Sequence, residues 1–130
     1  MPGETDLNEL LKTMHPVLNE GEYVFCTIPS NHTFDQTKTI GSFKEKEGLT
    51  VILEKQLADS LGLQYTFVAA WITLTVHSSL EAVGLTAAFS NALAQERISC
   101  NVIAAFYHDH IFVAQADAEK AMQLLQQLSN

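Results

Sequence analysis

Hydrophobic and polar positions follow regular patterns most clearly in the second half of the chain. Over Trp71–Val76 the even-numbered residues are aliphatic and the odd-numbered ones are tryptophan or threonine, which predicts a half-buried strand. Helical spacing over Ala82–Leu93 predicts a helix, and Cys100–Phe106 and His110–Gln115 predict two strands joined by a turn. Asp117 is expected to cap a last helix. Its apolar stripe is Ala118, Ala121, Met122, Leu125 and Leu128.

The first of these helices has two possible starts. Ser78 and Glu81 have the spacing of a capping box, in which the two side chains satisfy the free backbone N–H groups of the first turn. Alternatively, the chain stays irregular as far as Val83, and Gly84 opens the helix.

The first half of the chain predicts shorter elements. A helix over Asp6–Met14 should end at His15-Pro16, because the residue before proline avoids the helical region. Gly48 suits the tight connection of a hairpin, and 32–38 reads as a polar loop. The remaining predicted elements are strands at Tyr23–Ile28, Ile40–Glu45 and Leu49–Leu53 and a helix at Glu54–Leu61.

The second half therefore has the order β-α-β-β-α, a ferredoxin-like βαββαβ unit without its last strand. That strand must come from the N-terminal half or from another subunit. We expect an α+β protein of two intimately packed subdomains, residues 1–65 and 66–130, each with an antiparallel sheet and helices on one face.

Composition narrows the functional classes. Because 47% of residues are hydrophobic, the chain is expected to fold. Its net charge of −8 disfavours binding to nucleic acid or to an anionic membrane, since both require a basic surface. No apolar run approaches the roughly 20 residues of a membrane span. Cys26 and Cys100 lie in apolar runs and predict free thiols, which favours a cytoplasmic protein.

The polar segment between the first strand and first helix of the second half, His77–Gly84, is the best candidate for a ligand site. A helix N-terminus presents unpaired N–H groups to which a carboxylate can bind, and Gly84 would allow close approach. The structural alternative is that this segment only caps the helix. Asn101 could likewise bind a ligand or satisfy a nearby backbone group.

Other chemistry is sparse. His108-Asp109-His110 could contribute to a metal site, but zinc requires three or four ligands, and a solvated hairpin tip is the favoured interpretation. No nucleophile motif, P-loop or dinucleotide fingerprint is present. We therefore expect no enzyme, no cofactor and no metal.

The segment from Val76 to Val113 resembles the ACT domain of the aspartate-kinase regulatory type. The resemblance is strongest in VGLTA at 83–87, in LA at 93–94 through ISCNV at 98–102, and in DHIFV at 109–113. The first half, with YVFCTIP and FKEKEGLTVILE, resembles the partner module of small bacterial proteins with two ACT-like units, an architecture similar to that of arginine-sensing ACT proteins.

The resemblance implies a non-enzymatic regulatory protein, a homodimer or higher homo-oligomer, that binds an amino acid or similar effector. It implies a site in the loop before the first helix and on the facing strand. The residues so implied are His77, Ser78, Ser79, Val83, Gly84, Leu85 and Thr86, with Asn101 and Ile103. Because the N-terminal half must supply a strand, Ile28 and Pro29 are expected near the same pocket. The alternative is a dimerisation or interaction module that binds no ligand and regulates a partner enzyme or transporter.

Overall fold

The structure, a computed structural model, describes residues 6–29, 32–76 and 83–129. Its helices are α1 (Leu7–Thr13), α2 (Lys55–Ser60), α3 (Leu85–Gln95) and α4 (Ala118–Leu128), with short 3-10 turns η1 (Gln36–Lys38) and η2 (Gln115–Asp117). Its strands are β1 (His15–Leu18), β2 (Tyr23–Ile28), β3 (Gly41–Lys44), β4 (Leu49–Glu54), β5 (Val68–Thr75), β6 (Asn101–Ala104) and β7 (Asp109–Ala114). The chain divides into two compact units. We call residues 1–20 with 70–130 the split unit, and residues 21–69 the inserted unit.

The split unit has a sheet in the order β1-β5-β7-β6. Strand β1 pairs antiparallel with β5, from His15 opposite Thr75 to Leu18 opposite Ile72. Strands β6 and β7 form an antiparallel hairpin. This is the strand order of a complete ferredoxin-like unit, with its last strand taken from the N-terminal end of the same chain.

Strand β1 was not predicted, because proline reads as a helix terminator and as a poor strand residue. Pro16 is tolerated here for a geometric reason. The amide of Asn19 donates to the carbonyl of Trp71 (2.9 Å), and hydrogen-bonded pairs alternate along an antiparallel ladder. Pro16 therefore occupies a position whose N–H would point away from β5, and the ladder loses no bond.

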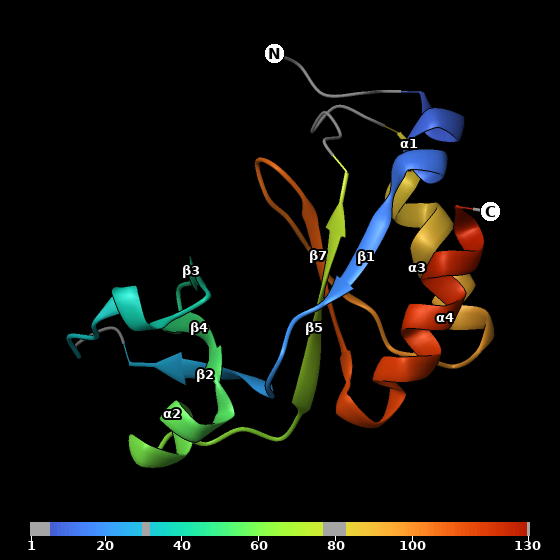
Figure 1. Cartoon of the computed structure of the whole chain (residues 1–130). Coiled ribbons are helices and arrows are strands. Elements are labelled where there is room, and N and C mark those ends of the chain that lie inside the picture. The colour runs from blue at the N-terminus through green and yellow to red at the C-terminus, as the bar shows by residue number, and fades with distance from the viewer. Residues whose placement is uncertain (1–5, 30–31, 77–82, 130) are drawn as a thin grey trace. The chain divides into compact units, whose positions relative to one another are not determined.

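The core of the split unit lies on one face of its sheet. The predicted alternation of β5 is confirmed, since Ile72, Leu74 and Val76 are buried in this core. Helices α3 and α4 lie side by side and cover this face, with α1 beside α3 (Figure 1). Each fully buried Leu or Phe there contributes roughly 1.5–3 kcal/mol to stability. The fully buried side chains of the helices are Leu10, Phe89, Leu93, Ala121 and Leu125.

The helix ends show which capping predictions hold. The carboxylate of Asp6 accepts from the amides of Asn8 and Glu9 and caps α1. Asp117 is the N-cap residue of α4, as predicted, but its side chain makes no capping hydrogen bond. The turn η2 leads directly into α4, so Asp117 has φ −98° and ψ 3° rather than the extended conformation that a side-chain cap requires.

The inserted unit has the order β5-β2-β4-β3, in which only the first two residues of β5 take part. Val68 and Ala69 pair with Val24 and Tyr23, while β4 pairs antiparallel with all of β2 and with β3. Helix α2 covers one face. Segment η1 stands where a ferredoxin-like unit has its first helix. The predicted α+β class, with antiparallel sheets and helices on one face, is confirmed in both units.

These spatial units differ from the predicted division at residue 65. Residues up to Glu20 group with the C-terminal half because α1 and β1 complete its core and sheet. Strand β5 spans the division: its first two residues close the sheet of one unit, and its remainder belongs to the other.

Candidate functional site

The predicted site at the start of α3 is only partly described. His77, Ser78 and Ser79 lie outside the described residues, as does the capping-box alternative that used Ser78 and Glu81. Helix α3 begins at Leu85 with Gly84 as its N-cap residue, at φ +98°. The second predicted start is therefore the one observed. A Cβ atom at Gly84 would also lie 3.2 Å from Cδ2 of Leu7, so the positive φ favours glycine here and the packing is tight.

The start of α3 is described from Val83 onward. Gly84 has no side chain with which to cap the first amides, and the first turn carries no acidic residue. Among the described residues, no acidic side chain of the first turn offsets the positive end of the helix dipole. Val83 is 82% exposed and Thr86 is exposed, whereas Leu85 is buried in the core.

Asn101 and Ile103 lie elsewhere in the same unit. Their neighbour Val102 packs against the core, so both side chains point to the sheet face opposite α3. The amide Nδ2 of Asn101 donates to the carbonyl of Phe112 (3.2 Å), which satisfies a backbone group as the structural alternative supposed. The structure does not bring these two residues to the start of α3.

Asp109 is a residue that the sequence interpretation misplaced. It was taken as part of a solvated turn, but it begins β7 and is only 7% exposed. Its side chain points to the core face, in alternation with Ile111 and Val113. Burial raises the pKa of its carboxyl group, against a smaller lowering by His108. Asp109 stands two and four residues before Ile111 and Val113, and this alternation could have indicated that it faces the core. Among the described residues, no three potential metal ligands gather.

Ile28 and Pro29 belong to the inserted unit. Ile28 is buried in its core, and Pro29 lines a cavity of about 290 Å³ between the end of β2, η1 and the β3–β4 turn. The cavity lining is Pro29, His32, Gln36, Lys44, Glu45, Gly48 and Leu49.

A positively charged and a negatively charged side chain both line this small cavity. Lys44 and Glu45 are adjacent at the end of β3, and the Glu45 carboxylate accepts a hydrogen bond from Thr50. The hydroxyl of Ser42 donates to Oε1 of Gln36 (3.1 Å) and positions that side chain. A Cβ at Gly48 would lie 2.8 Å from the carbonyl oxygen of Ile28, so glycine is needed for the turn to approach β2. Sequence spacing gave no signal for His32, Lys44 or Glu45, because the hairpin brings them together.

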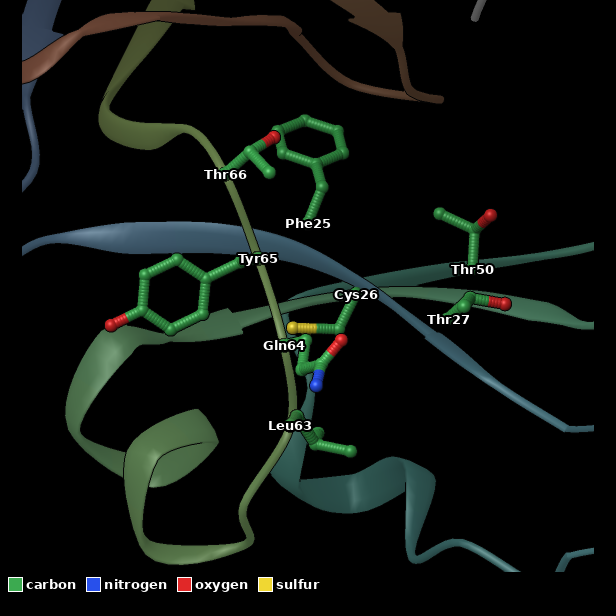
Figure 2. A pocket seen from close by; sticks show the side chains of 8 residues that line it. All are labelled: Phe25, Cys26, Thr27, Thr50, Leu63, Gln64, Tyr65 and Thr66. Carbon is green, nitrogen blue, oxygen red and sulfur yellow. The ribbon is translucent and has the colours of Figure 1, made fainter.

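A larger hollow of about 860 Å³ lies over β2 and the segment after α2 (Figure 2). Its lining is Phe25, Cys26, Thr27, Thr50, Leu63, Gln64, Tyr65 and Thr66. The hydroxyl of Tyr65 donates to Oδ1 of Asp59 (2.6 Å), and Lys55 contacts Oδ2 of the same carboxylate (3.0 Å). Among the described residues the two linings have no member in common, but Thr50 of this hollow donates to the carboxylate of Glu45, which lines the smaller cavity.

Neither cysteine has the lowered pKa that makes a thiol nucleophilic near neutral pH. Burial raises the pKa of Cys100 to about 11, and burial followed by the charge of Asp59 raises the pKa of Cys26. Both are free thiols and stay protonated near neutral pH, where the thiolate is the reactive form. In the described ranges no helix is long and apolar enough to cross a membrane.

Comparison with known proteins identifies the family of both halves. Two ACT domain profiles match the chain, one over residues 2–70 and the other over residues 67–127. A comparison with curated protein sequences found no match.

Solved structures agree with this assignment. The chain is similar to a Vibrio cholerae protein of unknown function, described as a possible transport protein, at 47% identity and a TM-score of 0.86, over 95% of this chain and 96% of that one. It shares its fold with the regulatory subunit of aspartate kinase from Thermus flavus, at 8% identity and a TM-score of 0.62, over 89% and 97% of the two chains. The chain belongs to the ACT domain family.

Proposed function

We propose that the protein is a non-enzymatic regulatory sensor that binds an amino acid. ACT domains are typically regulatory and bind amino acids. The observation that carries the proposal for this chain is the cavity of about 290 Å³ in which Lys44, Glu45 and His32 lie with Pro29. We further propose that the protein acts in the cytoplasm as a homodimer or higher homo-oligomer.

The cavity chemistry matches a zwitterion. The Lys44 ammonium group can pair with the ligand carboxylate, and the Glu45 carboxylate can pair with the ligand ammonium group. Pairing at both ends is needed because a charge that leaves water without a partner is costly. Pro29 and Leu49 supply apolar surface for a side chain. The volume is close to the lower end of typical small-ligand sites, which is about 300 Å³.

The start of α3 is the second proposed binding position. Val83, Gly84, Leu85 and Thr86 present the first-turn amides, to which a carboxylate can bind. The predicted contributions of His77, Ser78 and Ser79 remain part of this proposal, whereas those of Asn101 and Ile103, on the opposite sheet face, stay a separate prediction. Asp109, a buried carboxyl group of the same unit, is a further candidate for binding a ligand cation.

A thermal-shift screen of the twenty amino acids tests the function. A ligand present at 100 times its dissociation constant adds about 2.7 kcal/mol to the free energy of unfolding, so at least one amino acid should raise the melting temperature in a saturable way. No shift with any amino acid at millimolar concentration would exclude amino-acid sensing.

The second candidate function is an interaction module. It is supported by exposed aromatic residues on the edge strand β3 and in the β6–β7 turn. Phe43 on β3 is 72% exposed, and Phe106 and Tyr107, in the turn between β6 and β7, are also exposed. Edge strands offer backbone groups for pairing with another chain. Solution mass measured with and without amino acids separates the two functions, because a sensor changes its mass or stability with ligand and a constitutive module changes neither.

A further inference from the structure

We infer that Thr50, which does not itself line the small cavity, controls the affinity of that cavity for an amino acid. In the free protein the Thr50 hydroxyl holds the carboxylate of Glu45, and the ligand ammonium group takes over this carboxylate on binding. This role concerns the amino-acid site and therefore rests on the proposed function. It follows from the two faces of the β3–β4 hairpin on which the charged side chains lie.

Lys44 lies on the face of the hairpin that borders the cavity. Ser42 and Lys44 are two residues apart on β3, so their side chains point to the same face, and Ser42 donates to Gln36 of the cavity lining (3.1 Å). Lys44 also stands opposite Leu49, which lines the cavity and packs against the core of the inserted unit. The ammonium group of Lys44 is therefore on the side where a ligand carboxylate would bind.

The carboxylate of Glu45 is turned to the other face. Phe43 stands opposite Thr50, and Glu45 exchanges two backbone hydrogen bonds with Gly48 (3.0 and 3.3 Å), which continues the alternation of β3 by one residue. Phe43, Glu45 and Thr50 therefore share a face, where the Thr50 hydroxyl donates to Oε1 of Glu45. Among the residues that the structure describes, Lys44 and Glu45 form no ion pair with each other, in agreement with their opposite faces.

An α-amino acid requires both charges on one face. Its carboxylate and its ammonium group are attached to the same carbon, so a ligand that pairs with Lys44 presents its ammonium group on the Lys44 side. Glu45 is exposed and follows the last residue of β3, so its side chain can rotate toward the cavity. This rotation breaks the hydrogen bond from Thr50, and the loss of that bond lowers the affinity for the ligand.

The dissociation constants of the full-length natural chain and of Thr50→Val, measured by titration calorimetry, test this role. The probes are the amino acids that bind in the screen of all twenty. Removing the hydroxyl removes the competing donor, so Thr50→Val should bind them about two- to tenfold more tightly. Thr50→Ser keeps a hydroxyl and should bind like the natural chain. Thr27→Val makes the same change on the β2 residue opposite Thr50 (Figure 2) and should leave the affinity unchanged.

A probe without an ammonium group separates this exchange from a general change in the hairpin. Propionate is alanine without its amino group, and it has no donor with which to replace the Thr50 hydroxyl at Glu45. Thr50→Val should therefore not tighten the binding of propionate, or of the corresponding acid for any other amino acid that binds.

Weaker or unchanged binding of amino acids by Thr50→Val would overturn the inference, because Thr50 would then position Glu45 for the ligand or take no part. Equal tightening for the acid without the amino group would overturn it as well. In both cases an amino acid still binds, so the proposed function stands. If no amino acid binds either the natural chain or Thr50→Val, the proposed function fails and the role of Thr50 fails with it.

Discussion

The indole Nε1 of Trp71 donates a hydrogen bond to Nδ1 of His110, at 3.0 Å. An indole nitrogen is only a donor, so Nδ1 must carry a lone pair, and His110 is neutral with its proton on Nε2. The hydroxyl of Thr73 lies 3.1 Å from the same nitrogen, and Asn19 donates to that hydroxyl (3.0 Å). This network joins β5, β7 and the residue that follows β1, on the sheet face opposite the helices.

Stability should fall in mild acid because of His110. Burial, and next the charge of His108, lower its pKa. The unfolded chain therefore binds more protons, and the contribution of His110 is present above the unfolded pKa of about 6.5 and is lost as pH falls through that value toward the lower folded pKa. Urea unfolding from about pH 8 to about pH 5 should show a smaller loss for His110→Gln than for the natural chain.

The exposed His15 provides the control for this comparison. His15→Gln makes the same chemical change at an exposed histidine and controls for the replacement itself. Asp109, whose pKa is raised by burial, acts in the opposite direction, and it is present in all three proteins, so their differences isolate His110. An unchanged pH dependence in His110→Gln would show that the Trp71 bond does not hold His110 neutral.

Gly84→Ala should destabilise the split unit by about 1–3 kcal/mol, because a residue other than glycine is strained at positive φ. The new methyl group would also meet Leu7 at 3.2 Å. Gly41→Ala is the matched control, since its Cβ would meet only Cδ1 of Ile52 at 3.9 Å. The urea midpoint of each variant is compared with that of the natural chain. Equal losses of stability in Gly84→Ala and Gly41→Ala would contradict the described start of α3.

Much of the fold was predictable because local patterns agreed with it. The alternation along β5 and the apolar stripe of α4 determine which face is buried, and both were read correctly. Strand β1 was missed because four residues containing a proline have no strand signal; only the unpaired edge of β5 explains why they are extended. The required strand was predicted to exist, but its residues could not be named.

The candidate site was less predictable. Gly84 was correctly placed at a helix start as one of two alternatives, because its lack of a side chain is a local property. Asp109 was placed in a turn because the histidines beside it suggested a polar tip. Lys44 and Glu45 could not be recognised as site residues from the sequence, since a charged pair on an edge strand is usually solvated. Their proximity to Pro29 depends on how the hairpin returns to the end of β2.

Thr86→Glu separates ligand binding at α3 from folding. A carboxylate in the first turn of a helix adds about 0.3–1 kcal/mol of stability, so the melting temperature without ligand should rise. The same charge repels a ligand carboxylate, so the ligand-induced shift should shrink. Thr86→Gln has nearly the same shape without the charge and should keep the shift. If the glutamate and glutamine variants bind alike, the first turn of α3 does not receive the ligand carboxylate.

The most direct test of amino-acid sensing neutralises the charged pair of the small cavity. The measurement is the melting-temperature shift caused by the best amino acid of the screen, compared between Lys44→Gln/Glu45→Gln and Lys46→Gln/Glu47→Gln. The two double variants make the same chemical change on neighbouring exposed residues, but only the first pair lines the cavity. The proposal predicts that the first variant loses the shift while the second retains it. Equal shifts in the two variants would contradict it.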